Sequence, residues 1–204
     1  MRPLNKSLRK ELESLTSQYQ EGLSSALPYL QARGIDQDSA EKFRLGVVND
    51  SSFNNGRLAI PSLLPDGGVY SIRFRRLGED GPKYRGMAGV QTRLFNVRAV
   101  HEAGDEIHVT EGELDAVILD SLGYNAVAVC GSESWKRHHP RMLAGFQRVY
   151  VWGDGDDAGK KFSATVRDSL LTAKECKLDA GADVTDTFMA YGHEGIKKAM
   201  GEDG

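Results

Sequence analysis

The second half of the chain alternates short apolar runs with segments of helical spacing, and this alternation constrains the fold more than any other feature. After Gly104 the chain reads EIHVT, ELDAVILDSLG, NAVAVC, PRMLAGF, RVYVW and AGKKFSATVRDSLLTA, in that order. Strands that alternate with helices typically form a parallel sheet with helices packed against it. The pattern therefore predicts a small α/β domain over residues 101–204.

Residues 1–100 follow a different pattern and are predicted to form a separate α+β subdomain. Four leucines recur at helical spacing in a charged N-terminal segment: Leu4, Leu8, Leu12 and Leu15. This spacing predicts an amphipathic helix, and two short helices are expected after it, the first of them ending at Gly34. Over residues 44–98, short apolar or alternating runs are separated by Asn-Asn-Gly and Pro-Asp-Gly-Gly, which are hairpin turn signals. Mostly antiparallel strands with several basic residues are expected there.

The composition indicates a protein that folds without disulfides or a structural zinc ion. The chain has 204 residues, 40% of them hydrophobic, enough for one domain or one domain with a small companion. Its two cysteines, Cys130 and Cys176, form no Cys-x-x-Cys or Cys/His ligand pattern. A reducing, cytoplasmic location is therefore expected. No apolar run is long enough to span a membrane, and the N-terminus is too polar for a signal peptide, so no membrane association is expected.

Charge is distributed unevenly along the chain. The formal net charge is only −3, yet residues 57–98 contain eight arginines or lysines against three acids, and residues 102–120 contain seven acids and no Lys or Arg. A basic block next to an acidic block is what a site needs to hold polyanions beside divalent cations. The alternative interpretation is solvated surface charge.

Carboxylates follow two of the predicted strands. Glu111 comes directly after IHVT, and Asp154 and Asp156 come after VYVW. In an extended segment residues two apart point to the same side, so Asp154 and Asp156 are predicted to aim at one point while Gly155 permits a tight turn. Clustered carboxylates repel one another without a cation, and Mg²⁺ or Mn²⁺ takes oxygen ligands. The alternatives are an ordinary Asp-Gly turn and a Glu-Gly-Glu helix cap.

Two familiar motifs are excluded by spacing. A P-loop needs four residues between its glycines and then Gly-Lys-Ser/Thr, and neither Gly153 nor Gly155 satisfies this. An EF-hand loop that begins at Asp154 would place Ala158 at its fifth position and Thr165 where the bidentate glutamate belongs.

The acidic motifs resemble those of the Toprim domain, which is shared by bacterial-type primases, type IA and type II topoisomerases and some nucleases. Glu111 in TEGELDA matches the glutamate after the first strand of that family, and Asp154 and Asp156 in DGDDAG match its Asp-x-Asp. A third acidic element in primases resembles Lys-Asp-x-x-Asp. It corresponds here to Asp183 and Asp186 in GADVTDTF, with alanine in place of the lysine.

The upstream half resembles the segment that opens the RNA polymerase domain of bacterial and phage-type primases. YLQARGIDQDSAEKFRLGVV is similar to the start of that segment, and GRLAIP is similar to the Arg-x-x-x-Pro strand that follows it. In FRRLGEDGPKYRGMAG, Arg75 stands seven residues before Pro82, and Lys83-Tyr84 completes the Pro-Lys-Tyr motif. The resemblance extends over residues 28–198, and its motifs keep their order.

The resemblance implies a Toprim fold, Rossmann-like with a small, mostly parallel sheet, preceded by an α+β primase subdomain. It implies synthesis of short RNA primers on single-stranded DNA from nucleoside triphosphates, with Mg²⁺ or Mn²⁺ and no zinc. Glu111, Asp154 and Asp156 are the implied catalytic residues. The implied metal ligands are Glu111, Asp154, Asp156, Asp115 and Asp183. The implied phosphate-binding residues are Arg57, Arg75, Arg76, Lys83 and Arg85. Tyr84, Trp135 and Trp152 are candidates to stack on bases, although aromatics beside core strands are usually core residues.

Two features of primases are missing from the sequence. It contains no ligand pattern for the zinc-binding module that helps such enzymes choose a start site, and no helicase or helicase-binding segment. We therefore expect a catalytic core that works with a separate zinc-binding or helicase partner. The motif acids leave two other functions open: a Toprim nuclease that hydrolyses nucleic acid with the same metals, and a non-catalytic protein that binds single-stranded DNA or a replisome partner.

Overall fold

The chain divides into two compact units, residues 1–92 and 93–204, each with its own core. The structure is a computed structural model that describes residues 5–87, 93–131 and 134–201. The sequence pattern suggested a boundary near residue 100. Residues 93–100 belong to the second unit because Leu94 and Ala99 are buried in its core.

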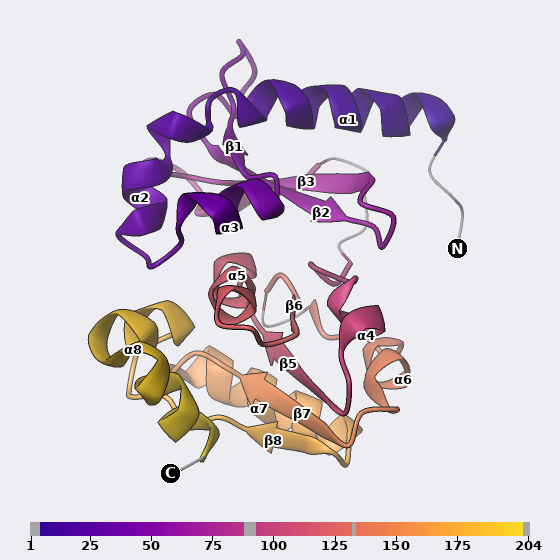
Figure 1. The fold of residues 1–204 in the computed structure, drawn as a ribbon, viewed down its shortest axis with the longest axis vertical. Helices are drawn as coiled ribbons and strands as arrows, with labels where there is room; N and C mark the ends of the chain where they lie inside the picture. Colours follow the sequence, from indigo (N-terminus) through magenta and orange to yellow (C-terminus); the bar gives the residue numbers. More distant parts are fainter. Residues whose placement is uncertain (1–4, 88–92, 132–133, 202–204) are drawn as a thin grey trace. The chain divides into compact units, whose positions relative to one another are not determined.

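The first unit combines short helices with an antiparallel sheet (Figure 1). Its helical elements are α1 (Lys6–Gln20), the 3₁₀ helix η1 (Leu23–Ser25), α2 (Leu27–Gln31) and α3 (Gln37–Lys42). Its strands are β1 (Gly46–Val47), β2 (Leu58–Leu63), β3 (Val69–Arg75) and β4 (Tyr84–Arg85). The strands lie in the order β1-β2-β3-β4, and every pair of neighbours is antiparallel.

The local sequence explains these elements. Asn5 caps α1 by accepting a hydrogen bond from the Ser7 amide, and the apolar face of α1 buries Leu12 against Ile72 of β3. Gly34 adopts a positive φ of 77° just after α2, where an L side chain would be strained, so the predicted helix stop is confirmed. Gly67 has a φ of 80° in the turn that joins β2 to β3.

The second unit contains a parallel four-stranded sheet in the order β6-β5-β7-β8 (Figure 1). Its strands are β5 (Glu106–Thr110), β6 (Ala126–Ala128), β7 (Arg148–Trp152) and β8 (Ala173–Glu175). Its helices are α4 (Ala99–Glu102), α5 (Glu113–Ser121), α6 (His139–Leu143), α7 (Asp157–Ser169) and α8 (Val184–Met200). The predicted parallel α/β sheet flanked by helices is confirmed.

The two faces of this sheet carry different side chains because residues alternate along each strand. Val109 and Val151 join one core with Phe162 of α7. The alternate residues of β5 and β7 project to the opposite face. There the ring of His108, next to Val109, stacks on the ring of Tyr150, next to Val151. Both faces are thus covered, as is usual for a parallel sheet.

The structure differs from the expected elements in two places. Residues 44–98 were expected to be mostly antiparallel strands, but residues 93–98 contain no strand; Phe95 makes an isolated bridge to Ala128, and Arg98 precedes α4. The sequence pattern gave no expectation for the long helix α8. It holds a non-helical Gly192, with φ 62°, that interrupts its periodicity. Among the described residues, no helix is long and apolar enough to cross a membrane.

Candidate functional site

The carboxyl ends of β5 and β7 bring the first two predicted carboxylates together. The two strands are parallel neighbours, and Thr110 lies opposite Trp152 in their register. The chain therefore leaves both strands at the same edge of the sheet, which is where parallel sheets carry ligand-binding groups. The Asp154 amide donates a hydrogen bond of 3.2 Å to Glu111 Oε1. This bond orients the Glu111 carboxylate toward the β7 loop.

The glycines of the β7 loop are required by close backbone contacts. A Cβ on Gly155 would clash with the carbonyl oxygen of Asp179, and one on Gly159 would clash with the backbone of Asp154. Asp156 ends this loop as the N-cap of α7, and its carboxylate accepts a hydrogen bond of 2.8 Å from the Gly159 amide. The Asp-Gly-Asp segment is therefore both a tight turn and a source of two carboxylates.

Asp115 is buried on α5, with 8% of its surface exposed. Its Oδ1 accepts hydrogen bonds from the Thr185 hydroxyl at 2.9 Å and from the Thr185 amide at 3.3 Å. Asp183, two residues earlier, is the N-cap of α8 and forms a reciprocal capping box with Asp186. Asp183 and Asp186 thus begin α8, and Thr185 ties that helix start to Asp115.

The carboxylates influence one another electrostatically. Burial, together with the charges of Asp154 and Asp156, raises the pKa of Glu111 to about 7. Burial, followed by the charges of Asp183 and Asp154, raises the pKa of Asp115 as well. All five carboxylates predicted as metal ligands therefore belong to one electrostatic cluster, whose ionised form is costly without a cation.

The donor chemistry of this cluster suits a hard divalent cation, although the side chains do not already form a coordination sphere. In the described parts of the chain, no three His, Cys, Asp or Glu side chains are grouped closely enough to hold a metal ion as they stand. Carboxylate oxygens are the ligands that Mg²⁺ and Mn²⁺ prefer, and a cation would remove the repulsion that raises the pKa of Glu111. A cation would bind here either through one or two carboxylates with water as the other ligands, or after more of the carboxylates move closer together.

In the first unit, three of the predicted phosphate-binding arginines gather around one loop. Arg57 is only 6% exposed, and its guanidinium donates a hydrogen bond of 3.0 Å to the Pro82 carbonyl. A Cβ on Gly81 would lie 3.6 Å from nitrogens of both Arg57 and Arg85. Burial and the charges of Arg85 and Arg76 lower the pKa of Arg57. This concentration of positive charge favours an anion near residues 76–85.

The other two predicted phosphate-binding residues lie on or beside β3 and β4. Arg75 donates a hydrogen bond of 2.7 Å from Nε to the Tyr29 hydroxyl and another to the Tyr84 hydroxyl, which fixes its guanidinium. Lys83 is exposed, with its ammonium 5.9 Å from the centre of the Tyr84 ring. Arg73, one position from β3's centre, stacks over the same ring at 4.2 Å.

Trp152 does not offer a stacking surface. It is 1% exposed, stacks with His108 and donates a hydrogen bond of 3.0 Å from Nε1 to His108 Nδ1. Burial lowers the pKa of His108 to about 3, so the ring is neutral and can accept this bond. Of the two roles considered for Trp152, base stacking and core packing, the structure supports core packing, and the Trp152–His108 pair belongs to the core beneath the carboxylates.

Two residues at the candidate site were missed from the sequence. Thr185 holds Asp115 across 70 positions of chain, and Tyr29 holds Arg75 across 46. The position of Thr185 between Asp183 and Asp186 was the available signal for its proximity to an acidic site. Tyr29 carried no signal, because nothing in its local sequence indicates an arginine partner.

Comparison with known proteins adds to this geometry. Residues 108–187 match the Toprim-like family. The chain is 33% identical over 145 residues to the Gene 57 protein of Mycobacterium phage D29, in an alignment that covers 69% of this chain and 95% of that protein. It is 29% identical over 209 residues to the DNA primase of Helicobacter pylori strain J99, covering 80% of this chain and 37% of the primase. The chain thus spans little more than a third of that primase.

Solved structures show the same fold. The zinc-binding and RNA polymerase domains of the Aquifex aeolicus primase superpose with a TM-score of 0.85 at 24% identity, covering 98% of this chain and 62% of that chain. A DnaG primase catalytic domain bound to single-stranded DNA superposes with a TM-score of 0.80 at 20% identity, covering 97% of this chain and 78% of that one. The likeness therefore extends over both units.

Proposed function

This chain belongs to the family of Toprim-type primase catalytic cores, and from that membership we propose that it synthesises short RNA primers on single-stranded DNA. The observation that carries the proposal is the carboxylate cluster at the ends of β5 and β7. It lies in a fold that matches a primase over 98% of the chain. A nucleotidyltransferase of this kind uses carboxylates to hold divalent metal, and the metal in turn binds the negatively charged polyphosphate.

The carboxylates would hold Mg²⁺ or Mn²⁺ through Glu111, Asp154 and Asp156, with Asp115 and Asp183 as further ligands. When bound, the metal offsets the charge of the triphosphate and of the attacked phosphorus. The protein prepares the ligands with its own hydrogen bonds. The Asp154 amide orients Glu111, and Thr185 orients Asp115. Ligand positions held in this way cost less to assemble around the metal.

The basic residues would bind phosphates. Arg75 is fixed by two tyrosine hydroxyls, so its planar fork is already oriented for a phosphate. Arg57, Arg76 and Arg85 supply a cluster of positive charge, and Lys83 supplies an exposed point charge. We assign this set to the triphosphate and the template backbone. In primer synthesis the 3′-hydroxyl of one nucleotide attacks the α-phosphate of the next, and pyrophosphate leaves.

Start-site recognition is not assigned to these 204 residues. The sequence contains no zinc-ligand pattern, and its two cysteines are both buried. We therefore propose that a separate zinc-binding or helicase partner selects the template position, while this chain supplies bond formation.

The test is direct. The protein is incubated with single-stranded DNA, labelled nucleoside triphosphates and Mg²⁺ or Mn²⁺, and both short RNA products and template cleavage are measured. RNA products that disappear in an Asp154→Asn variant are expected. Template cleavage without synthesis would replace the proposal with a nuclease, and DNA binding with neither reaction would indicate a non-catalytic binder.

A further inference from the structure

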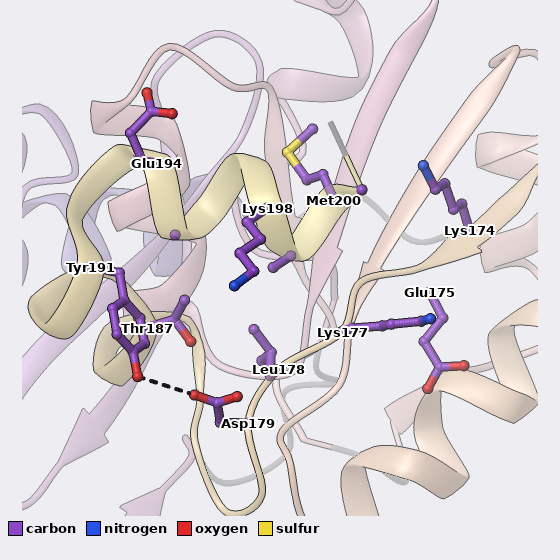
Figure 2. A pocket seen from close by; sticks show the side chains of 13 residues that line it. Lys174, Glu175, Lys177, Leu178, Asp179, Thr187, Tyr191, Glu194, Lys198 and Met200 are labelled. Atoms are coloured by element: carbon purple, nitrogen blue, oxygen red, sulfur yellow. Dashed lines mark hydrogen bonds between the residues drawn. The ribbon is translucent and has the colours of Figure 1, made fainter. Parts of the chain in front are cut away.

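A pocket of about 820 Å³ opens beside the edge strand of the second unit, between β8, residues 177–179 and α8 (Figure 2). None of the five candidate metal ligands lines it. Its volume is in the range of sites that bind small molecules or cofactors. The pocket is therefore separate from the carboxylate cluster and large enough for a nucleotide.

Three lysines and three acids line this pocket, and two of the acids already have cationic partners of their own. Its walls include Lys174, Lys177 and Lys198, and in the part of the chain that the structure describes none of them forms a salt bridge. Figure 2 shows the Lys198 ammonium directed between the walls. Three ammonium groups without carboxylate partners favour an anion with several charges, such as a polyphosphate.

The acids of the pocket are mostly neutralised already. Glu175 pairs with Arg167 at 2.7 Å, and Glu194 pairs with Lys197 at 3.0 Å. Asp179 is the remaining carboxylate and accepts a hydrogen bond of 3.4 Å from the Tyr191 hydroxyl (Figure 2). Of the three acids that line the pocket, only Asp179 has no cationic partner among the described residues.

One wall offers a surface for a planar ring. Tyr191 is 61% exposed, and its hydroxyl is tied to Asp179, which limits the rotation of the ring. Leu178 and Met200 add apolar surface nearby. An exposed aromatic ring beside ammonium groups matches a ligand that carries both a base and phosphates.

The pocket shares a backbone segment with the carboxylate loop. The Gly155 amide donates to the Ala182 carbonyl at 2.7 Å, and the Gly181 amide donates to the Gly155 carbonyl at 3.0 Å. The same segment, a few residues earlier, supplies Asp179 and Lys177 to the pocket. A ligand in the pocket therefore contacts the segment that holds the loop between Asp154 and Asp156.

We propose that this lysine pocket is a second nucleotide site, which binds a nucleoside triphosphate through Lys174, Lys177 and Lys198 with its base against Tyr191. The site goes beyond primer synthesis, which we assign to the carboxylate cluster and to the basic residues of the first unit. It does not require divalent metal, because lysines rather than carboxylates meet the phosphates.

The experiment measures ATP binding to the full chain by calorimetry in EDTA. Without metal the carboxylate cluster repels triphosphate, so the remaining binding reports basic sites. Replacing Lys177→Glu and Lys198→Glu together is expected to weaken ATP binding by about tenfold or more, since charge-assisted bonds are lost and two negative charges are added. The matched control is Lys6→Glu with Lys10→Glu, an equal charge change on exposed positions of α1, and it should leave the affinity unchanged.

Further arms identify the ligand class. Inorganic triphosphate should bind more weakly than ATP, and Tyr191→Leu should remove that difference, whereas Tyr191→Phe should keep it. A short single-stranded DNA should bind the Lys177/Lys198 variant as it binds the wild type. The milder Lys177→Gln with Lys198→Gln variant, checked by circular dichroism, should show the same loss in smaller degree and so guards against misfolding.

Three results would overturn the proposal. The first is an absence of ATP binding to the wild type in EDTA. The second is a loss of ATP binding in the Arg76→Glu with Arg85→Glu variant but not in the lysine variants. The third is a loss of DNA affinity rather than ATP affinity in the lysine variants. Because the measurement uses no metal and no polymerisation, it stands or falls independently of primer synthesis.

Discussion

Glu111 is a partly buried residue whose charge state affects the stability of the metal-free protein. Its ordinary pKa of 4.5 is raised to about 7 by burial and by the charges of Asp154 and Asp156. Between these two values the unfolded chain has lost its proton and the folded chain keeps it, so the folded state binds more protons. Stability from this group is therefore present below about pH 4.5 and is lost as the pH rises through about 7.

We accordingly predict that the metal-free protein loses thermal stability between about pH 5 and about pH 8. After allowance for solvent screening, the Glu111 contribution is about 2 kcal/mol, or roughly 5 °C in Tm. Melting curves in EDTA across this range should show the fall in the wild type and a flatter profile in Glu111→Gln. The exposed Glu11→Gln variant on α1 is the control and should follow the wild type. Equal profiles for all three proteins would contradict the raised pKa.

Asp154 and Asp156 carry the second prediction at this scale, which concerns metal binding. Replacing both with asparagine should abolish the heat of Mn²⁺ binding in calorimetry, because two anionic ligands are removed. Asparagine is the appropriate substitution since Asp156 caps α7, and an alanine there would cost about 1 kcal/mol of stability for a reason unrelated to metal. Mn²⁺ binding that survives in the Asn/Asn variant, with an unchanged melting temperature, would refute the site.

The site residues differ in how visible they were in the sequence. Glu111 follows the run IHVT directly, and Asp154 and Asp156 come shortly after VYVW, so the strand pattern located all three. Thr185 and Tyr29 were not found, because their partners at the site, Asp115 and Arg75, lie 70 and 46 positions away in the sequence. Contacts between distant positions are set by tertiary packing, which a local pattern does not contain.

At the scale of elements, the longer strands of both sheets were predictable, whereas the edge strand β8 and the last helix were not. The hairpin turn signals located β2 and β3, and the apolar runs located β5, β6 and β7. Helix α8 contains Gly192 and Gly195, which weaken helical propensity, and its start reads as an acidic motif. The predicted α7 helix extended to residue 173, whereas the structure ends it at Ser169 and begins β8 at Ala173.

The loop between β3 and β4 carries the third prediction, which concerns DNA affinity. Arg76 and Arg85 belong to its cationic cluster. If they contact phosphates, single-stranded DNA affinity should fall steeply with salt. Reversing both to glutamate should flatten the slope of log K against log salt by about 1.4, at about 0.7 per phosphate contact. Filter binding across a salt series measures this. The Lys6→Glu with Lys10→Glu variant has the same net charge and should retain the wild-type slope. Affinity that does not depend on salt would exclude an electrostatic interface.

At the scale of the whole molecule, the candidate metal ligands and the candidate phosphate-binding residues lie in different units, each with its own hydrophobic core. All five candidate metal ligands lie in residues 93–204, and all five candidate phosphate-binding residues lie in residues 1–92. The change in sequence pattern predicted two units. The strand order β6-β5-β7-β8 was not predictable, because the order in space depends on crossover connections rather than on strand propensity.

The last prediction concerns initiation by the intact chain. Joining two free nucleotides on a template is entropically costly unless something holds both, and these residues contain no zinc-ligand pattern for a template-reading module. A short primer already paired to the template removes much of that cost. We therefore expect feeble synthesis from free nucleotides and a yield about tenfold higher or more with a preformed primer, at equal nucleotide and metal concentrations. The Asp154→Asn variant should be inactive both with and without the primer. This result would show that both reactions depend on the carboxylate cluster. Efficient, sequence-specific initiation by the chain alone would show that it reads its own start site, and the need for a separate zinc-binding or helicase partner would then disappear.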